Sequence, residues 1–145
     1  MNNVQRLTLY SIVCVMHCTI ASQESSMSKR TMIKAQHCLP CEGGVKPLSL
    51  QEIQETLPDF PGWSLKEEKP YTISRQFIFK DFVSAMEFVN VIAMIAEEEG
   101  HHPDMHIVYN KVTFELFTHA IQGLSLNDFI IADRIDDAYN EFIHE

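Results

Sequence analysis

One segment constrains the fold more than any other, because it has the pattern of a long amphipathic helix with a signal at each end. From Asp81 to Glu99, apolar residues recur at steps of three and four, which places them on one helical face. They are Phe82, Ala85, Met86, Val89, Ile92, Ala93 and Ala96. Asp81 is a favourable N-cap, and Gly100 can adopt the left-handed conformation in which many helices end. The segment therefore predicts a helix that packs one face against a core.

Strand patterns lie on both sides of this helix. Residues 63–66 and 71–79 precede it, and the second stretch alternates Tyr71, Ile73, Phe77 and Phe79 on one side. Residues 104–109 and 112–118 follow as a hairpin, and shorter helices are expected near 50–57 and 125–142. The order helix, strand, strand, helix, strand, strand, helix predicts an α+β fold in which helices cover one face of a four-stranded antiparallel sheet.

The chain of 145 residues is long enough for one domain, which we place at residues 37–145. Residues 1–36 show no clear period and are expected to be a disordered or only locally helical extension. The apolar run at 7–16 is too short to span a membrane, which needs about 20 residues. It is either a weak secretory signal or sequence upstream of a start at Met27 or Met32.

Charge and cysteine content narrow the class of protein. The formal net charge is −9, so the chain repels phosphate backbones and direct nucleic-acid binding is not expected. All four cysteines lie before Gly43, which fits a reducing, cytoplasmic compartment. They are Cys14, Cys18, Cys38 and Cys41. Their spacing also allows a zinc ribbon, which is an alternative interpretation.

Histidines form the candidate catalytic group. His101 and His102 follow the long helix and precede Pro103, so they lie in a loop and can exchange protons near neutral pH. A turn at Asn110-Lys111 would pair Tyr109 with Val112. The same hairpin register would set His102 opposite His119.

Asp128 lies in the first turn of the expected last helix. With Ser125 three residues before it, Asp128 completes a capping box, so it is explained by helix capping, by catalysis or by both.

The order and spacing of these residues resemble the pterin-4a-carbinolamine dehydratase family. The resemblance covers about residues 37–143 and rests on a set of spaced positions, namely Glu97, His101, His102, Pro103, Tyr109, His119 and Asp128. The stretches 79–82, 109–112 and 123–125 are also similar to that family. Met105 departs from it, because some members have tryptophan at this position.

The resemblance implies an enzyme that removes water from a 4a-hydroxytetrahydropterin without a metal or bound cofactor. It implies that His102 is the base at N5 and that His101 and His119 are acids or binders near the hydroxyl. Asp128 would orient a histidine, Glu97 would support the His101 loop and Pro103 would contact the substrate.

The resemblance also implies a homodimer or homotetramer. Two alternatives to the enzyme stay open: a protein-binding dimerisation cofactor of a transcription factor, and a metal protein built on His101, His102, His106 and the cysteines.

Overall fold

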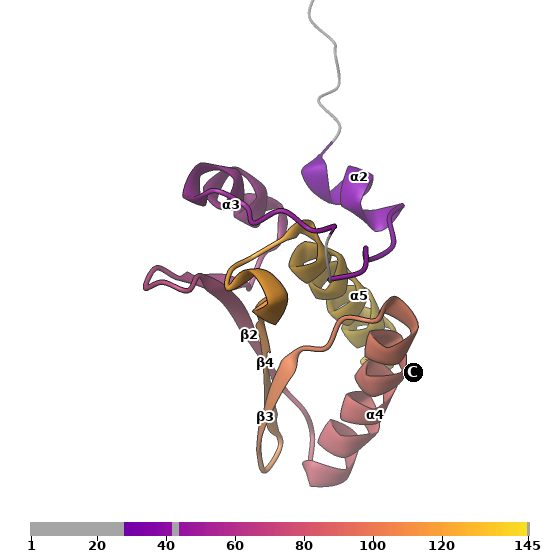
Figure 1. Cartoon of the computed structure of the whole chain (residues 1–145). Coiled ribbons are helices and arrows are strands. Elements are labelled where there is room, and N and C mark those ends of the chain that lie inside the picture. The colour runs from indigo at the N-terminus through magenta and orange to yellow at the C-terminus, as the bar shows by residue number, and fades with distance from the viewer. Residues whose placement is uncertain (1–27, 42–43, 145) are drawn as a thin grey trace, which may run out of the picture.

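The computed structural model describes residues 28–41 and 44–144 (Figure 1). The strands are β1 (Ser64–Lys66), β2 (Thr72–Ile78), β3 (Asp104–Val108) and β4 (Lys111–Leu116). The helices are α2 (Lys29–Lys34), α3 (Leu50–Thr56), α4 (Phe82–Glu99) and α5 (Leu126–Phe142), with short 3-10 helices η1 (Leu57–Asp59) and η2 (His119–Ile121). None of the helices in the described ranges is long and apolar enough to cross a membrane.

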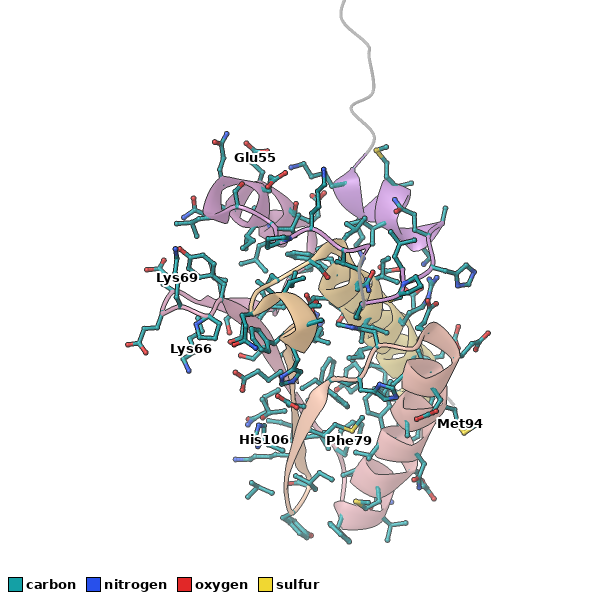
Figure 2. All side chains as sticks on the ribbon, in the orientation of Figure 1. Glu55, Lys66, Lys69, Phe79, Met94 and His106 are labelled. Carbon is teal, nitrogen blue, oxygen red and sulfur yellow. The ribbon has the colours of Figure 1, made fainter. Side chains whose placement is uncertain are left out.

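The four strands form one sheet in the order β1-β2-β4-β3, and every neighbouring pair is antiparallel. Helices α4 and α5 pack against the same face of this sheet (Figure 1). Phe79 points into the layer between sheet and helices, whereas His106 points to the other side (Figure 2). The predicted α+β fold with helices on one face is therefore confirmed.

The core lies between the sheet and the two long helices. Strand alternation buries Ile73 and Phe77 on β2, and it buries alternate residues of β4 completely. Helix α4 contributes Ala85, Phe88, Ile92 and Ala96. These positions are three or four residues apart and therefore form one stripe on the helix. This stripe is narrower than the face of seven residues that the sequence predicts. Phe82 and Ala93, which were expected on the buried face, are exposed instead.

The helix ends agree with the sequence. The Asp81 side chain accepts from the backbone N–H of Ser84, and Gly100 ends α4 with φ 64°. Ser49 and Ser125 each cap a helix through a complete capping box, α3 and α5 respectively. These caps satisfy backbone donors that the first helical turn leaves without partners.

Part of the predicted extension belongs to the folded domain. Helix α2 lies within residues 1–36, buries Ile33 and packs against α5. Arg30 Nε lies 2.6 Å from Asp133 Oδ1 of α5. The domain therefore begins before residue 37, where the sequence analysis placed its boundary. The sequence did not reveal this helix because six residues are too few to show a clear period. Residues 1–27, with both interpretations of the apolar run, lie outside the described residues.

The hairpin register differs from the prediction by two residues. Val108 pairs with Lys111 and Ile107 with Val112, so the turn consists of Tyr109 and Asn110. Asn110 is held in the turn because its Nδ2 donates to the Phe79 carbonyl and its own carbonyl accepts from Phe79 N–H. A shift of two keeps every side chain on its predicted face.

The shift nevertheless removes the expected pairing of two histidines. In the observed register His102 is not opposite His119, and β4 ends at Leu116 before it reaches His119.

Candidate active site

A buried histidine and a buried carboxylate form the centre of the candidate site. Nε2 of His101 lies 2.8 Å from Oδ1 of Asp128 and donates to it. His101 follows the C-terminus of α4, and Asp128 lies in the first turn of α5, so the two helices bring the pair together. The His101 side chain is only 5% exposed and that of Asp128 is fully buried. Asp128 thus contacts a histidine, as expected, while its catalytic role stays a prediction.

The second carboxylate oxygen of Asp128 accepts hydrogen bonds from the start of α5 and from the end of the hairpin. Oδ2 accepts from the Ser125 N–H at 2.7 Å and from the Thr118 hydroxyl at 2.7 Å. Thr118 and Ser125 are fully buried. Because these donors fix the carboxylate, Oδ1 is presented to His101 in one orientation.

Cys41 contacts the opposite side of the His101 ring. Its Sγ lies 3.5 Å from His101 Nδ1, and Nε2 already donates to Asp128, so Nδ1 is the acceptor of the thiol. Both ring nitrogens of His101 therefore have partners within the chain. The sequence showed a CxxC motif here but gave no signal that it would lie against His101.

The segment with this motif is anchored to α4 and α5. The Cys38 N–H donates to Glu99 Oε2 at 2.9 Å, and Arg134 Nε lies 3.3 Å from Glu99 Oε1. Burial raises the pKa of Glu99, but the Cys38 N–H, the Arg134 guanidinium and His37 outweigh it and hold this pKa below its usual value. Glu99 is therefore a structural anchor at the end of α4.

His102 is the exposed neighbour of His101. Its side chain is 60% exposed, and its Nε2 lies 3.0 Å from Glu97 Oε1. Glu97 thus contacts His102, although the resemblance placed it in support of the His101 loop. Pro103 is buried, so little of its surface is open to a substrate.

His119 lies at the same end of the hairpin. Strand β3 begins at Asp104 and β4 ends at Leu116, so the antiparallel pair brings both ends together. His119 follows β4 in η2, and its Nε2 is 3.9 Å from Asp104 Oδ2. Its side chain is 69% exposed. The site thus combines one buried histidine with two exposed histidines, each of which contacts a carboxylate.

The sequence missed one buried hydroxyl group and one carboxylate of this arrangement. Thr118 donates to Asp128, and Asp104 faces His119. The contact of Ser125 with Asp128 was predicted as a capping box, whereas these two contacts depend on where the hairpin ends. Such contacts between distant segments leave no local sequence signal.

The metal interpretations receive no geometric support from the described residues. Within 28–41 and 44–144, no group of three or more His, Cys, Asp or Glu side chains is arranged to hold a metal ion. Cys14 and Cys18, the first pair of the possible zinc ribbon, lie outside these ranges.

Comparison with known proteins places the chain in a family. The fold and site define a small α+β domain with a histidine-rich site beside a helix N-terminus. Residues 46–138 match the model of the pterin 4 alpha carbinolamine dehydratase family. The chain belongs to this family.

Individual relatives agree with this assignment. A protein of Chlorobaculum tepidum, provisionally named a pterin-4-alpha-carbinolamine dehydratase, is 41% identical over 107 residues, covering 73% of this chain and 96% of the relative. A relative from Nitrosomonas europaea with the same provisional name is 48% identical over 100 residues, which is 68% of this chain and 86% of the relative.

A solved structure from Brucella melitensis, described as a transcriptional coactivator/pterin dehydratase, matches with a TM-score of 0.61 and 32% identity. The match covers 64% of this chain and 98% of that one.

Proposed function

We propose that this chain dehydrates a 4a-hydroxytetrahydropterin to a quinonoid dihydropterin and water, as a hydro-lyase of tetrahydropterin recycling. The observation that carries the proposal is the buried His101–Asp128 pair beside the exposed His102, within a chain of this family. The reaction breaks the C4a–O bond and removes the N5 proton, so it needs one acid and one base. Histidines can fill both roles near neutral pH without a metal or bound cofactor.

His102 is assigned as the base. Its Nε2 donates to the Glu97 carboxylate, so Nδ1 keeps its lone pair and can accept the N5 proton. Its exposure leaves the ring accessible to a small-molecule substrate.

His119 is assigned as the acid that protonates the leaving hydroxyl. It is exposed, and the nearby Asp104 carboxylate compensates the charge of its imidazolium. His101 was expected to act beside it, but its burial and its two bonded ring nitrogens favour a different role. His101 is therefore assigned as a positioning residue for the loop that carries His102.

The test is the dehydration rate of a 4a-hydroxytetrahydropterin generated in situ, followed by ultraviolet absorbance with chelator present. The intact chain should exceed the spontaneous rate, and His102→Ala should lower the rate constant by about 10²-fold or more. His106→Ala is the matched control, since His106 is an exposed histidine of β3 that points away from the helical layer. A folded intact chain with no acceleration would overturn the proposal.

A homo-oligomer is proposed as the working form, as a dimer or tetramer. Helix α4 exposes Val83, Val91 and Met94, and Met94 points away from the sheet (Figure 2). A second copy would remove this apolar surface from water. If the chain is monomeric in solution, the same surface favours the alternative of a protein-binding coactivator, the other role in the description of the Brucella melitensis structure.

The compartment and partners are proposed from charge and thiol chemistry. Cys38 and Cys41 are free thiols, which fits a reducing cytoplasm. The net charge of −9 favours a small-molecule substrate and disfavours direct binding to nucleic acid.

A further inference from the structure

Cys41 takes no part in the proposed dehydration, yet it lies against the His101 imidazole. Its Sγ is 3.5 Å from Nδ1, and Asp128 Oδ1 is 2.8 Å from Nε2 on the other side of the same ring. Thiol, imidazole and carboxylate therefore form one continuous line of contacts. We propose that Cys41 is a base-activated thiol and a modification site for small-molecule disulfides.

The direction of proton transfer follows from the fixed carboxylate. Asp128 is held by Ser125 and Thr118, so His101 keeps its proton on Nε2 and presents the lone pair of Nδ1 to the sulfur. Transfer of the Cys41 proton to Nδ1 gives a thiolate beside an imidazolium, and the buried carboxylate compensates the imidazolium. This is the arrangement by which an adjacent base activates a nucleophile.

A second contact places an N–H donor against the Cys41 sulfur. Asn127 Nδ2 lies 3.7 Å from Cys41 Sγ and donates to it. The Asn127 side chain also exchanges two hydrogen bonds with the backbone of Leu39, at 3.0 Å and 2.7 Å. Asn127 is buried, so it places a polarised N–H against the sulfur and holds the segment that carries it.

The other cysteine of the motif has the opposite environment. Cys38 Sγ donates to the backbone carbonyl of Asn127. Burial, together with the negative charges of Glu99 and Asp128, raises the pKa of the Cys38 thiol to about 12. Cys38 is therefore a structural thiol, while Cys41 has a base on one side and an N–H donor on the other.

The reaction is a thiol–disulfide exchange. The Cys41 proton moves to His101 Nδ1 as Sγ attacks one sulfur of the reagent, and a new S–S bond forms while the old one breaks. The leaving thiolate takes the proton from the imidazolium, so the products are a mixed disulfide on Cys41 and a free thiol. The adduct deprives His101 of its thiol partner and would slow dehydration. That consequence, unlike the reactivity itself, rests on the proposed function.

The test uses full-length chains that keep a single thiol and react with dithiodipyridine, whose released thiopyridone absorbs in the ultraviolet. The first carries Cys14→Ser, Cys18→Ser and Cys38→Ser, which leaves Cys41. The matched chain carries Cys41→Ser in place of Cys38→Ser, which leaves Cys38. Each is measured folded and in urea. Cys41 should react about tenfold faster folded than unfolded, because general-base assistance is available only in the fold. Cys38 should react more slowly when folded.

Adding His101→Gln to the Cys41 chain should abolish most of this acceleration. If the His101→Gln variant does not fold, the proposal is tested by comparing the reaction rate of Cys41 in the folded chain with its rate in the unfolded chain. A Cys41 rate that folding does not increase, or that His101→Gln leaves unchanged, would overturn the proposal.

Discussion

His101 and Asp128 lie 27 positions apart in the chain and meet at 2.8 Å in the interior. The two carboxylate oxygens of Asp128 have separate partners. Oδ1 accepts from His101, while Oδ2 accepts from the Ser125 N–H that begins α5 and from Thr118 at the end of the hairpin. The helix cap and the orientation of His101 thus depend on the same side chain, so the capping contact and the contact with His101 coexist.

Asp128→Asn should lower both activity and stability. The amide nitrogen of asparagine cannot accept a hydrogen bond, so either His101 or the buried Ser125 N–H loses its acceptor. A buried donor without a partner costs about 1–3 kcal/mol. We expect the free energy of unfolding, measured by urea titration, to fall by this amount. The dehydration rate constant should also fall, by about tenfold or more, because the loop that carries the histidines is misplaced.

Ser125→Ala is the matched control for Asp128→Asn. It removes the hydroxyl that accepts from Asn127 N–H at the start of α5 and costs about 1 kcal/mol. Asp128 Oδ2 loses its 3.3 Å contact with this hydroxyl but keeps the Ser125 N–H and the Thr118 hydroxyl, and Oδ1 keeps His101, so activity should be largely retained. If Ser125→Ala reduced activity as much as Asp128→Asn, the effect would belong to the cap and not to the histidine.

Glu97→Gln tests the exposed partner of His102. Gln keeps an oxygen that can accept from His102 Nε2 but removes the negative charge. Exposed ion pairs contribute about 0.2–1 kcal/mol, so the rate constant should fall by less than about fivefold. The measurement is the pH profile of the dehydration rate, with Glu98→Gln as the neighbouring control. An effect of equal size in both variants would contradict a specific role for Glu97.

The parts of the fold that could be predicted from the sequence are those with local signals. The period of residues 81–99, the caps at Asp81 and Ser125 and the alternation of β2 and β4 depend only on neighbouring residues. The two-residue error in the hairpin arose because Asn110 is placed by hydrogen bonds to Phe79, which is 31 positions away. Turn chemistry alone does not distinguish the two registers.

The sequence grouped the candidate residues better than it arranged them, and their roles in catalysis stay a prediction. The resemblance singled out His101, His102, His119 and Asp128, and the structure places them around the same end of the hairpin. It did not predict that His101 is buried between a carboxylate and a thiol. Burial of a polar side chain depends on packing between distant segments, and the motif at residues 38–41 reaches His101 only through such packing.

Arg30→Ala should destabilise the fold strongly, because it removes the closer of two arginines that face a buried carboxylate of α5 and leaves Arg134 at 3.9 Å. Arg30 lies 2.6 Å from Asp133, whose side chain is fully buried, and 3.2 Å from Asp136. Breaking a buried ion pair from one side costs about 3–5 kcal/mol. Urea unfolding should show a loss of this order. Lys29→Ala is the control, since its ion pair with Glu55 is exposed and should change the free energy of unfolding by less than about 1 kcal/mol.

Acidification should remove the contribution of Glu99 to stability. Its pKa is lower in the folded chain than in the unfolded one, where it is about 4.3. The folded state therefore binds fewer protons than the unfolded state between the two pKa values. The contribution of Glu99 to the free energy of unfolding is therefore complete above about pH 4.3, and it is lost as the pH falls through the folded pKa.

The measurement compares the free energy of unfolding of the intact chain and of Glu99→Gln at about pH 6 and at a pH about one unit below the ordinary glutamate pKa. The intact chain should be the more stable of the two at the higher pH, and the difference should shrink at the lower pH. Because other carboxylates titrate in both chains, only the difference reports on Glu99. Glu98→Gln, an exposed neighbour on α4, should show no such change. A Glu99→Gln difference that stays constant with pH would show that its contacts with Cys38 and Arg134 do not depend on charge.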